Sequence, residues 1–198
     1  MSTETTTPLC GLVLAGGRSS RMGTDKASLV HPDGRALGQR AYDLLGQAGC
    51  SEVYLSLRSD QELPDGFADV SPNLLRDPEG ESSGPLSGIL AAMDARPDAD
   101  WLIVACDLPK LDEETLRHLL ASRREGELFL AYRSEFDQLP EPLCTWYSKD
   151  AKDLIANGGY HCPRKILIRN ECRLLDPIRQ GALDNANTPE DWELSTKP

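Results

Sequence analysis

Glycines and cationic side chains gather in one short stretch of the sequence, directly after an apolar run. The apolar run covers residues 9–15, residues 16–17 are both glycine, and Arg18, Arg21 and Lys26 follow. Glycine permits close approach of the backbone to a ligand, and successive N–H groups in such a loop form a concavity that binds anions. Arg and Lys add positive charge around that concavity. The stretch therefore predicts a site for a chain of phosphates.

Two familiar phosphate-binding motifs do not fit this stretch. The Walker pattern places Lys and then Ser or Thr directly after its last glycine, whereas Thr24 and Asp25 follow Gly23. The dinucleotide fingerprint G-x-G-x-x-G is absent because the glycines at 16 and 17 are adjacent. For these two glycines alone, a polar turn between a strand and a helix remains the alternative.

A carboxylate follows a second apolar run. Asp107 comes directly after residues 101–106, which have the pattern of a buried strand. In an open α/β sheet, ligands bind beyond the carboxyl ends of the strands, so Asp107 should face the glycine-rich loop. Magnesium prefers one or two carboxylates together with phosphate oxygens and waters. We therefore predict a Mg²⁺ ion on Asp107, with a turn-capping aspartate as the alternative.

A cysteine nucleophile is not expected beside this carboxylate. Cys106 belongs to the apolar strand, its side chain should alternate away from Asp107, and no histidine is placed to pair with it. A buried cysteine often acts as a small hydrophobic residue.

Strand patterns and helix patterns alternate along the chain. This alternation predicts a three-layer α/β/α, Rossmann-like fold with a mostly parallel sheet and right-handed crossovers. We expect one domain over residues 9–198 behind a flexible tail over residues 1–8. The expected strands are 9–15, 52–57, 73–76, 101–106, 127–132 and 143–147, and the expected helices are 37–48, one starting at Pro85, one capped by Asp112, 149–156, 163–169 and one capped by Thr188.

Composition excludes several classes of protein. Lys and Arg number 21 and Asp and Glu 32, giving a net charge of −11, so neither nucleic acid nor an anionic membrane is an expected partner. The 6 cysteines form no C-x-x-C pair, which disfavours structural zinc and fits a reducing, cytoplasmic setting. No apolar run approaches the ~18 residues of a membrane span, and the polar first residues do not resemble a secretory signal.

Four motifs in order carry a resemblance to a known family. The segment L-A-G-G-R-S-S-R-M-G-T-D-K-A-S-L, at 14–29, closely resembles the signature L-A-G-G-x-S-x-R-M-G-x-D-K-x-x-L of molybdenum cofactor guanylyltransferases. The matches continue at 83–89 (S-G-P-L-S-G-I), 105–109 (A-C-D-L-P) and 185–191 (N-A-N-T-P-E-D). The resemblance spans roughly residues 9–192 and implies the nucleotidyltransferase variant of the Rossmann-like fold, with antiparallel strands late in the chain.

The resemblance also implies site residues. It makes Asp107 the magnesium ligand, with Lys26 and Arg21 beside it as the cations of the catalytic centre. Independently of the resemblance, Arg164 and Lys165 after Pro163 form a late basic pair that could hold the second substrate's phosphate, with a solvated helix start as the nearly equal alternative. The implied nucleotide-binding residues are Leu14, Ala15, Gly16, Gly17, Lys26, Ser56, Asp77 and Asp107, and the predicted substrate-binding residues are Gly84, Asn187, Arg164 and Lys165.

The resemblance implies an activity in turn. A protein of this family transfers GMP from GTP to molybdopterin, releases pyrophosphate, uses Mg²⁺ and can work beside other cofactor-assembly proteins. The A-G-G step at 15–17 favours guanine, because cytidylyltransferase relatives more typically carry L-A-A-G. A CTP-using or sugar-phosphate nucleotidyltransferase is the nearest alternative. A non-catalytic nucleotide-binding or cofactor-delivery module is the alternative of another class.

Overall fold

The computed structural model describes residues 7–17, 25–68, 70–77 and 84–196. Arg18, Arg21 and Gly23 of the glycine-rich stretch lie outside the described residues, as does most of the expected tail. The phosphate-binding roles expected for the two arginines therefore stay predictions.

A seven-stranded sheet forms the centre of the molecule, with strand order β3-β2-β1-β4-β6-β5-β7. The strands are β1 (Leu9–Leu14), β2 (Glu52–Leu57), β3 (Asn73–Arg76), β4 (Asp100–Ala105), β5 (Phe129–Arg133), β6 (Pro140–Tyr147) and β7 (Arg173–Leu175). The pairs β1–β2, β1–β4, β2–β3 and β5–β7 are parallel. Strand β6 runs antiparallel to both β4 and β5, so the sheet is mostly parallel but mixed, as predicted.

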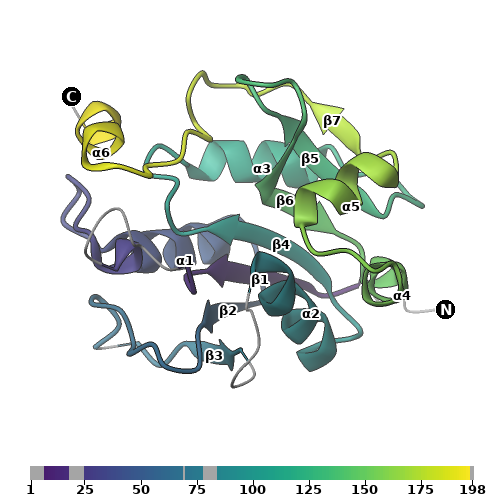
Figure 1. The fold of residues 1–198 in the computed structure, drawn as a ribbon, viewed down its shortest axis with the longest axis horizontal. Helices are drawn as coiled ribbons and strands as arrows, with labels where there is room; N and C mark the ends of the chain where they lie inside the picture. Colours follow the sequence, from purple (N-terminus) through teal and green to yellow (C-terminus); the bar gives the residue numbers. More distant parts are fainter. Residues whose placement is uncertain (1–6, 18–24, 69, 78–83, 197–198) are drawn as a thin grey trace, which may run out of the picture.

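Helices cover both faces of this sheet (Figure 1). They are α1 (Leu37–Gln47), α2 (Pro85–Ala95), α3 (Glu113–Ala121), α4 (Lys152–Asn157), α5 (Pro163–Arg169) and α6 (Pro189–Thr196), with 3₁₀ turns η1 (Lys26–Ser28) and η2 (Lys149–Ala151). One buried cluster joins α1 and α3 to the sheet, and a second joins α2, α4 and α5 to the opposite face. The neighbours Leu12 and Val13 of β1 belong to different clusters because successive strand side chains alternate. The three-layer prediction is confirmed.

Local signals in the sequence explain where several helices begin. The Asp112 carboxylate accepts the Thr115 N–H at 2.9 Å and caps α3, as predicted. Pro85 occupies the first turn of α2, behind Gly84 in extended conformation. The Asp191 carboxylate accepts the N–H groups of Asn187 and Thr188, while the Asp191 N–H donates to the Thr188 hydroxyl at 3.1 Å. These reciprocal bonds cap α6 at the predicted residue.

Some expected element bounds differ from the structure. Strand β5 starts at Phe129 and ends at Arg133, not 127–132, and the expected helix over 149–156 divides into η2 and α4. The sequence did not predict β7 or η1, which have three residues each. Segments of that length carry too few residues to display a strand or helix period.

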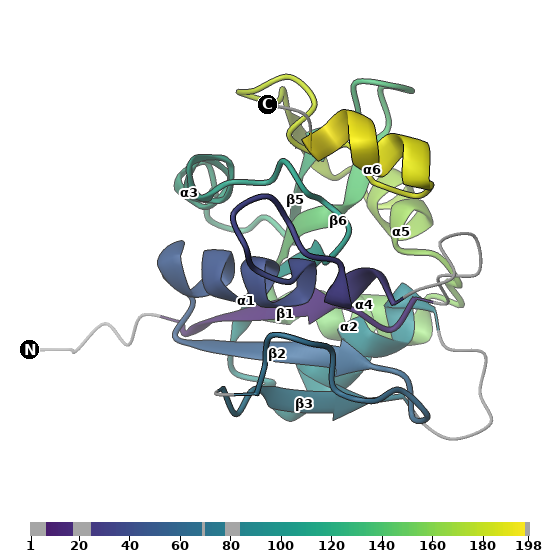
Figure 2. The same cartoon turned by 90° about the vertical axis from the view of Figure 1, so that its left-hand side faces the viewer.

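The topology brings several chain segments to one edge of the sheet. The parallel strands β1 and β4 end there, whereas the antiparallel β6 begins there. Helix α6 lies at the far end of the molecule from β3 (Figure 1 and Figure 2). In the described part of the chain no helix is both long enough and apolar enough to cross a bilayer.

Candidate active site

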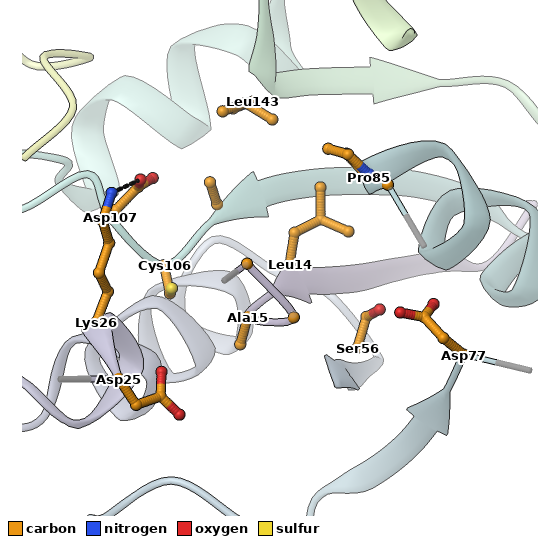
Figure 3. Close-up of a pocket in the computed structure, with 14 residues that line it drawn as sticks. Leu14, Ala15, Asp25, Lys26, Ser56, Asp77, Pro85, Cys106, Asp107 and Leu143 are labelled. Carbon is orange, nitrogen blue, oxygen red and sulfur yellow. Dashed lines mark hydrogen bonds and ion pairs between the residues drawn. The ribbon is translucent and has the colours of Figure 1, made fainter. Parts of the chain in front are cut away.

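A cavity of about 180 Å³ opens beyond the carboxyl ends of β1 and β4 (Figure 3). It collects residues from separate segments that the sequence analysis singled out. Its lining includes Leu14, Ala15, Gly16, Gly17, Asp25, Lys26, Ser56, Asp77, Gly84, Pro85, Cys106, Asp107 and Leu143. Every described residue of the predicted nucleotide-binding set therefore borders this one cavity.

Lys26 connects three of the sequence motifs. Its ammonium group lies 2.8 Å from the Asp107 Oδ2 atom and donates to the Asn187 Oδ1 atom, also at 2.8 Å. Lys26 is the first residue of η1, which Asp25 caps by accepting the Ala27 N–H at 3.0 Å. The motif that contains Lys26 thus meets Asp107 and Asn187 in space.

Asp107 combines burial with an open acceptor. Its side chain is 15% exposed, and the Ala186 N–H donates to its carbonyl oxygen at 3.0 Å, which ties the segment before α6 to the end of β4. Its Oδ1 atom is buried and has no hydrogen-bond partner among the described residues. An unsatisfied carboxylate oxygen is costly to bury, so this atom is a candidate ligand for a cation.

Two side chains from the loop after β2 hold the glycine-rich segment by its carbonyl oxygens. The Arg58 guanidinium donates to the carbonyls of Gly16 and Gly17, each at 3.1 Å. The Gln61 amide donates to the Ala15 carbonyl at 3.0 Å and to the Asp25 carboxylate at 2.8 Å. Gln61 therefore joins the segment after β1 to the turn that carries Lys26.

Ser56 and Asp77 form the opposite side of the cavity, at the ends of β2 and β3. Their side-chain oxygens point toward one another (Figure 3). Ser56 is buried, at 4% exposure, and α2 packs closely against it. A Cβ atom added to Gly88 of α2 would lie 2.4 Å from the Ser56 hydroxyl oxygen. This close approach explains a glycine inside a helix, where glycine normally costs stability.

A second cavity, of about 720 Å³, adjoins the first. Leu143 borders both cavities, and Asn187 borders the second. Arg164 also borders it, but its guanidinium pairs with the Asp137 carboxylate at 2.6 Å and lies 3.8 Å from that of Glu141. The predicted substrate residues are thus divided, because Gly84 borders the first cavity and Asn187 and Arg164 border the second.

Lys165 is exposed on α5 and is not among the residues described around either cavity. The structure therefore does not bring the two members of the expected basic pair to one site.

Cys106 borders the first cavity, yet its thiol is not activated. Burial raises the pKa of this thiol far above its ordinary value, and the Asp107 and Asp25 carboxylates add to the rise. The thiol is therefore protonated at neutral pH, in agreement with the expectation that no cysteine nucleophile operates here.

Arg58, Gln61 and Glu141 are not among the site residues predicted from the sequence. Arg58 and Gln61 belong to a polar loop without periodicity, so no pattern separates them from ordinary surface residues. Glu141 lies before the stretch that was predicted as a strand. The structure extends β6 to Pro140, and period-two alternation back from Leu143 would have drawn attention to Glu141.

Comparison with known proteins identifies the family of this chain. The family of MobA-like NTP transferase domains matches residues 11–172 of the chain. The chain belongs to this family. Within it, a molybdenum cofactor guanylyltransferase from Xanthomonas euvesicatoria is 42% identical over 193 residues, covering 93% of this chain and 93% of the relative. A molybdenum cofactor biosynthesis bifunctional protein from Synechocystis is 41% identical over 94% of this chain, which spans about half (53%) of that relative's length.

Solved structures share the fold of this MobA-like domain. A molybdopterin-guanine dinucleotide biosynthesis protein A from Archaeoglobus fulgidus superposes with a TM-score of 0.75 at 20% identity, over 94% of this chain and 96% of the other. A Mycobacterium tuberculosis protein in complex with manganese gives 0.66 at 20% identity, over 96% of this chain and 98% of the other. The predicted family and the nucleotidyltransferase fold are both confirmed.

Proposed function

We propose that this MobA-like chain transfers GMP from GTP to molybdopterin and releases pyrophosphate, which yields the guanine dinucleotide form of the cofactor. The observation that carries the proposal is the meeting of Lys26, Asp107 and Asn187 beside two adjoining cavities. Such an arrangement provides separate space for a nucleotide and for an acceptor. The relative from Xanthomonas, named a molybdenum cofactor guanylyltransferase, supports the choice of substrates.

The reaction joins the two substrates through phosphate. An oxygen of the terminal phosphate of molybdopterin attacks the α-phosphorus of GTP and forms the new P–O bond. The bond between the α-phosphorus and the bridging oxygen breaks, and its electron pair leaves with pyrophosphate. This exchange needs no covalent intermediate on the enzyme, so positioning and charge stabilisation account for most of the catalysis.

The residues around Asp107 fit a magnesium ion. The buried, unpartnered Oδ1 atom of Asp107 and the amide oxygen of Asn187 are the hard oxygen ligands that Mg²⁺ prefers, with phosphate oxygens and waters completing the shell. Among the described residues, no group of three or more His, Cys, Asp or Glu side chains is arranged to hold a metal ion by itself, so a metal at this site would need the phosphate oxygens of the nucleotide as further ligands. When bound, the ion supplies positive charge that offsets the charge developing on the phosphates.

The chain's own residues bind and orient the nucleotide. Lys26 and the backbone of residues 15–17 hold the phosphate chain, with Arg21 of the same motif contributing further charge. Ser56 and Asp77 line the side of the cavity that receives the nucleoside. Arg58 and Gln61 keep the glycine-rich segment in place through its carbonyl oxygens. All six cysteines are free, which fits a reducing, cytoplasmic setting, and we further propose that the chain works there beside other cofactor-assembly proteins.

Measurement of pyrophosphate release with each nucleotide and acceptor tests the proposal. GTP with molybdopterin should turn over, whereas CTP with molybdopterin and GTP with a hexose 1-phosphate should not. Turnover with CTP would identify a cytidylyltransferase, and turnover only with the sugar phosphate would overturn the assignment of the acceptor. Binding of GTP with no release of pyrophosphate in the presence of any of these acceptors would favour a non-catalytic module.

A further inference from the structure

The second cavity contains a buried carboxylate that the transfer reaction does not use. Glu141, in β6, is only 8% exposed although its side chain is ionisable. Its Oε1 atom accepts the Leu143 N–H at 3.4 Å, and its Oε2 atom lies 3.8 Å from the Arg164 guanidinium. Each carboxylate oxygen has two acceptor positions, so both oxygens can accept a further hydrogen bond from a ligand.

The Arg164 guanidinium already has two carboxylates as neighbours, which limits its use as a phosphate ligand. Its guanidinium lies 2.6 Å from the Asp137 carboxylate and near that of Glu141, so two negative charges already surround this one cation. A guanidinium neutralised in this manner has little charge left to offer a phosphate. Arg164 is thus placed to orient the Glu141 carboxylate, which lies 3.8 Å from its guanidinium.

The surroundings of Glu141 disfavour the charged form of its carboxyl group. Burial raises the pKa of this carboxyl, and the negative charges of Asp137 and Asp107 add to the rise. The Leu143 N–H and the Arg164 guanidinium oppose it. A buried carboxylate of this kind is best stabilised by hydrogen-bond donors, so a ligand rich in N–H groups suits the site better than another anion.

We propose that Glu141 selects the acceptor by recognising its heterocycle. The Glu141 carboxylate accepts hydrogen bonds from the 2-amino group and the neighbouring ring N–H on the pyrimidinone edge of the acceptor. This inference rests on the proposed function, under which the acceptor is a pterin that carries both groups side by side. Two adjacent N–H donors match the two oxygens of a carboxylate, as they do in other bidentate pairs. A heterocycle without the amino group leaves part of this buried acceptor unsatisfied and binds more weakly.

Glu141 lies close to the point where the two cavities adjoin. Glu141 precedes Leu143 by two residues, and two residues of an antiparallel strand span about 7 Å. Since Leu143 borders both cavities, Glu141 lies within about this distance of their junction, and an acceptor that spans both cavities would bring its heterocycle to Glu141. The last register pair between β4 and β6 is Val104 with Cys144, and β6 extends from there to Glu141 on the side where β4 ends.

An aromatic side chain at the same cavity suits a flat ring. Phe136, in the connection between β5 and β6, is 96% exposed and borders the second cavity. A large apolar side chain is unfavourable in water when it is so fully exposed, and an offset stack against a planar heterocycle would cover its ring.

Fluorescence titration with two pteridines tests the inference independently of the transfer reaction. Pterin has the 2-amino group, whereas lumazine has an oxygen in its place. The wild-type chain should bind pterin about tenfold or more tightly than lumazine, since sites built to pair with an N–H discriminate strongly. Glu141→Gln, which exchanges one acceptor oxygen for a donor, should abolish this preference.

Glu135→Gln is the matched control. Glu135 borders the same cavity, but its Oε2 atom accepts the Gly181 N–H at 2.7 Å, a bond that a glutamine oxygen can keep. This control should retain the preference for pterin. Arg164→Gln should weaken the preference and Arg164→Lys should restore most of it. A Glu141→Gln variant that still prefers pterin, or a wild-type chain that binds neither compound or does not distinguish them, would overturn the inference.

A transfer assay separates this inference from the proposed function. Glu141→Gln should raise KM for molybdopterin by about tenfold or more and leave KM for GTP unchanged. If the wild-type chain transfers GMP to molybdopterin and Glu141→Gln changes neither KM nor pterin preference, the inference fails and the function stands. If the chain prefers pterin through Glu141 but transfers nothing to molybdopterin, the proposed function fails and the role of Glu141 stands.

Discussion

Gln61 gives the sharpest test of how the glycine-rich segment is held. It is 7% exposed, and its amide donates to the Ala15 carbonyl and to the Asp25 carboxylate while its oxygen accepts the Arg58 N–H at 3.3 Å. Gln61→Met keeps the length of the side chain and removes all three bonds. Ala15 is buried, so its carbonyl stays unsatisfied, at about 1–3 kcal/mol, whereas water can reach the partly exposed Asp25. We expect a total loss of about 2–4 kcal/mol in the free energy of unfolding.

Urea denaturation measures this loss, and a nucleotide assay measures its consequence. The Asp25 cap fixes the turn that begins with Lys26, so Gln61→Met should also raise KM for GTP. Gln47→Met is the matched control because Gln47 is exposed on α1, and it should change stability by no more than about 0.5 kcal/mol. A Gln61→Met variant as stable as this control would refute the role given to Gln61.

Two further predictions concern the packing of α2 and the attachment of β7. Gly88→Ala should destabilise the fold by about 1–3 kcal/mol through its contact with Ser56 and should raise KM for GTP, and a gain in stability on urea denaturation would contradict this. The bond from Arg173 holds the pKa of Glu127 below its ordinary value, so Glu127→Gln should cost about 1–3 kcal/mol at pH 7. The ion pair stabilises the fold above the pKa of Glu127 in the unfolded chain, and this stabilisation is lost as the pH falls through the lower pKa of the folded chain. The difference in unfolding free energy between the wild type and Glu127→Gln should therefore disappear below about pH 4. A difference that does not change with pH would contradict the pairing.

Most of the fold could be predicted because its signals are local. Buried parallel strands appear as apolar runs, and caps such as Asp112 and Thr188 mark helix starts with single residues. The short strand β7 escaped prediction because three residues show no alternation, and its place beside β5 depends on tertiary contacts such as the pair of Arg173 with Glu127.

The candidate site could be predicted only in part, for a physical reason. The rule that ligands bind at the carboxyl ends of strands was sufficient to bring Lys26 and Asp107 to one edge of the sheet. The partners of a long side chain, however, depend on which segments the fold brings near it. Sequence reasoning could therefore not foresee that Asp137 and Glu141 occupy Arg164, or that Gln61 reaches back to Ala15.

Asp107→Asn tests the central claim most directly. This change keeps the size of the side chain but removes the carboxylate that pairs with Lys26 and that would hold magnesium. Pyrophosphate release from GTP with molybdopterin and Mg²⁺ should fall by at least about a hundredfold. Circular dichroism and thermal unfolding should show that the variant keeps its fold. Turnover within a few-fold of the wild-type rate in a folded variant would contradict the assignment of this edge of the sheet as the site of nucleotidyl transfer.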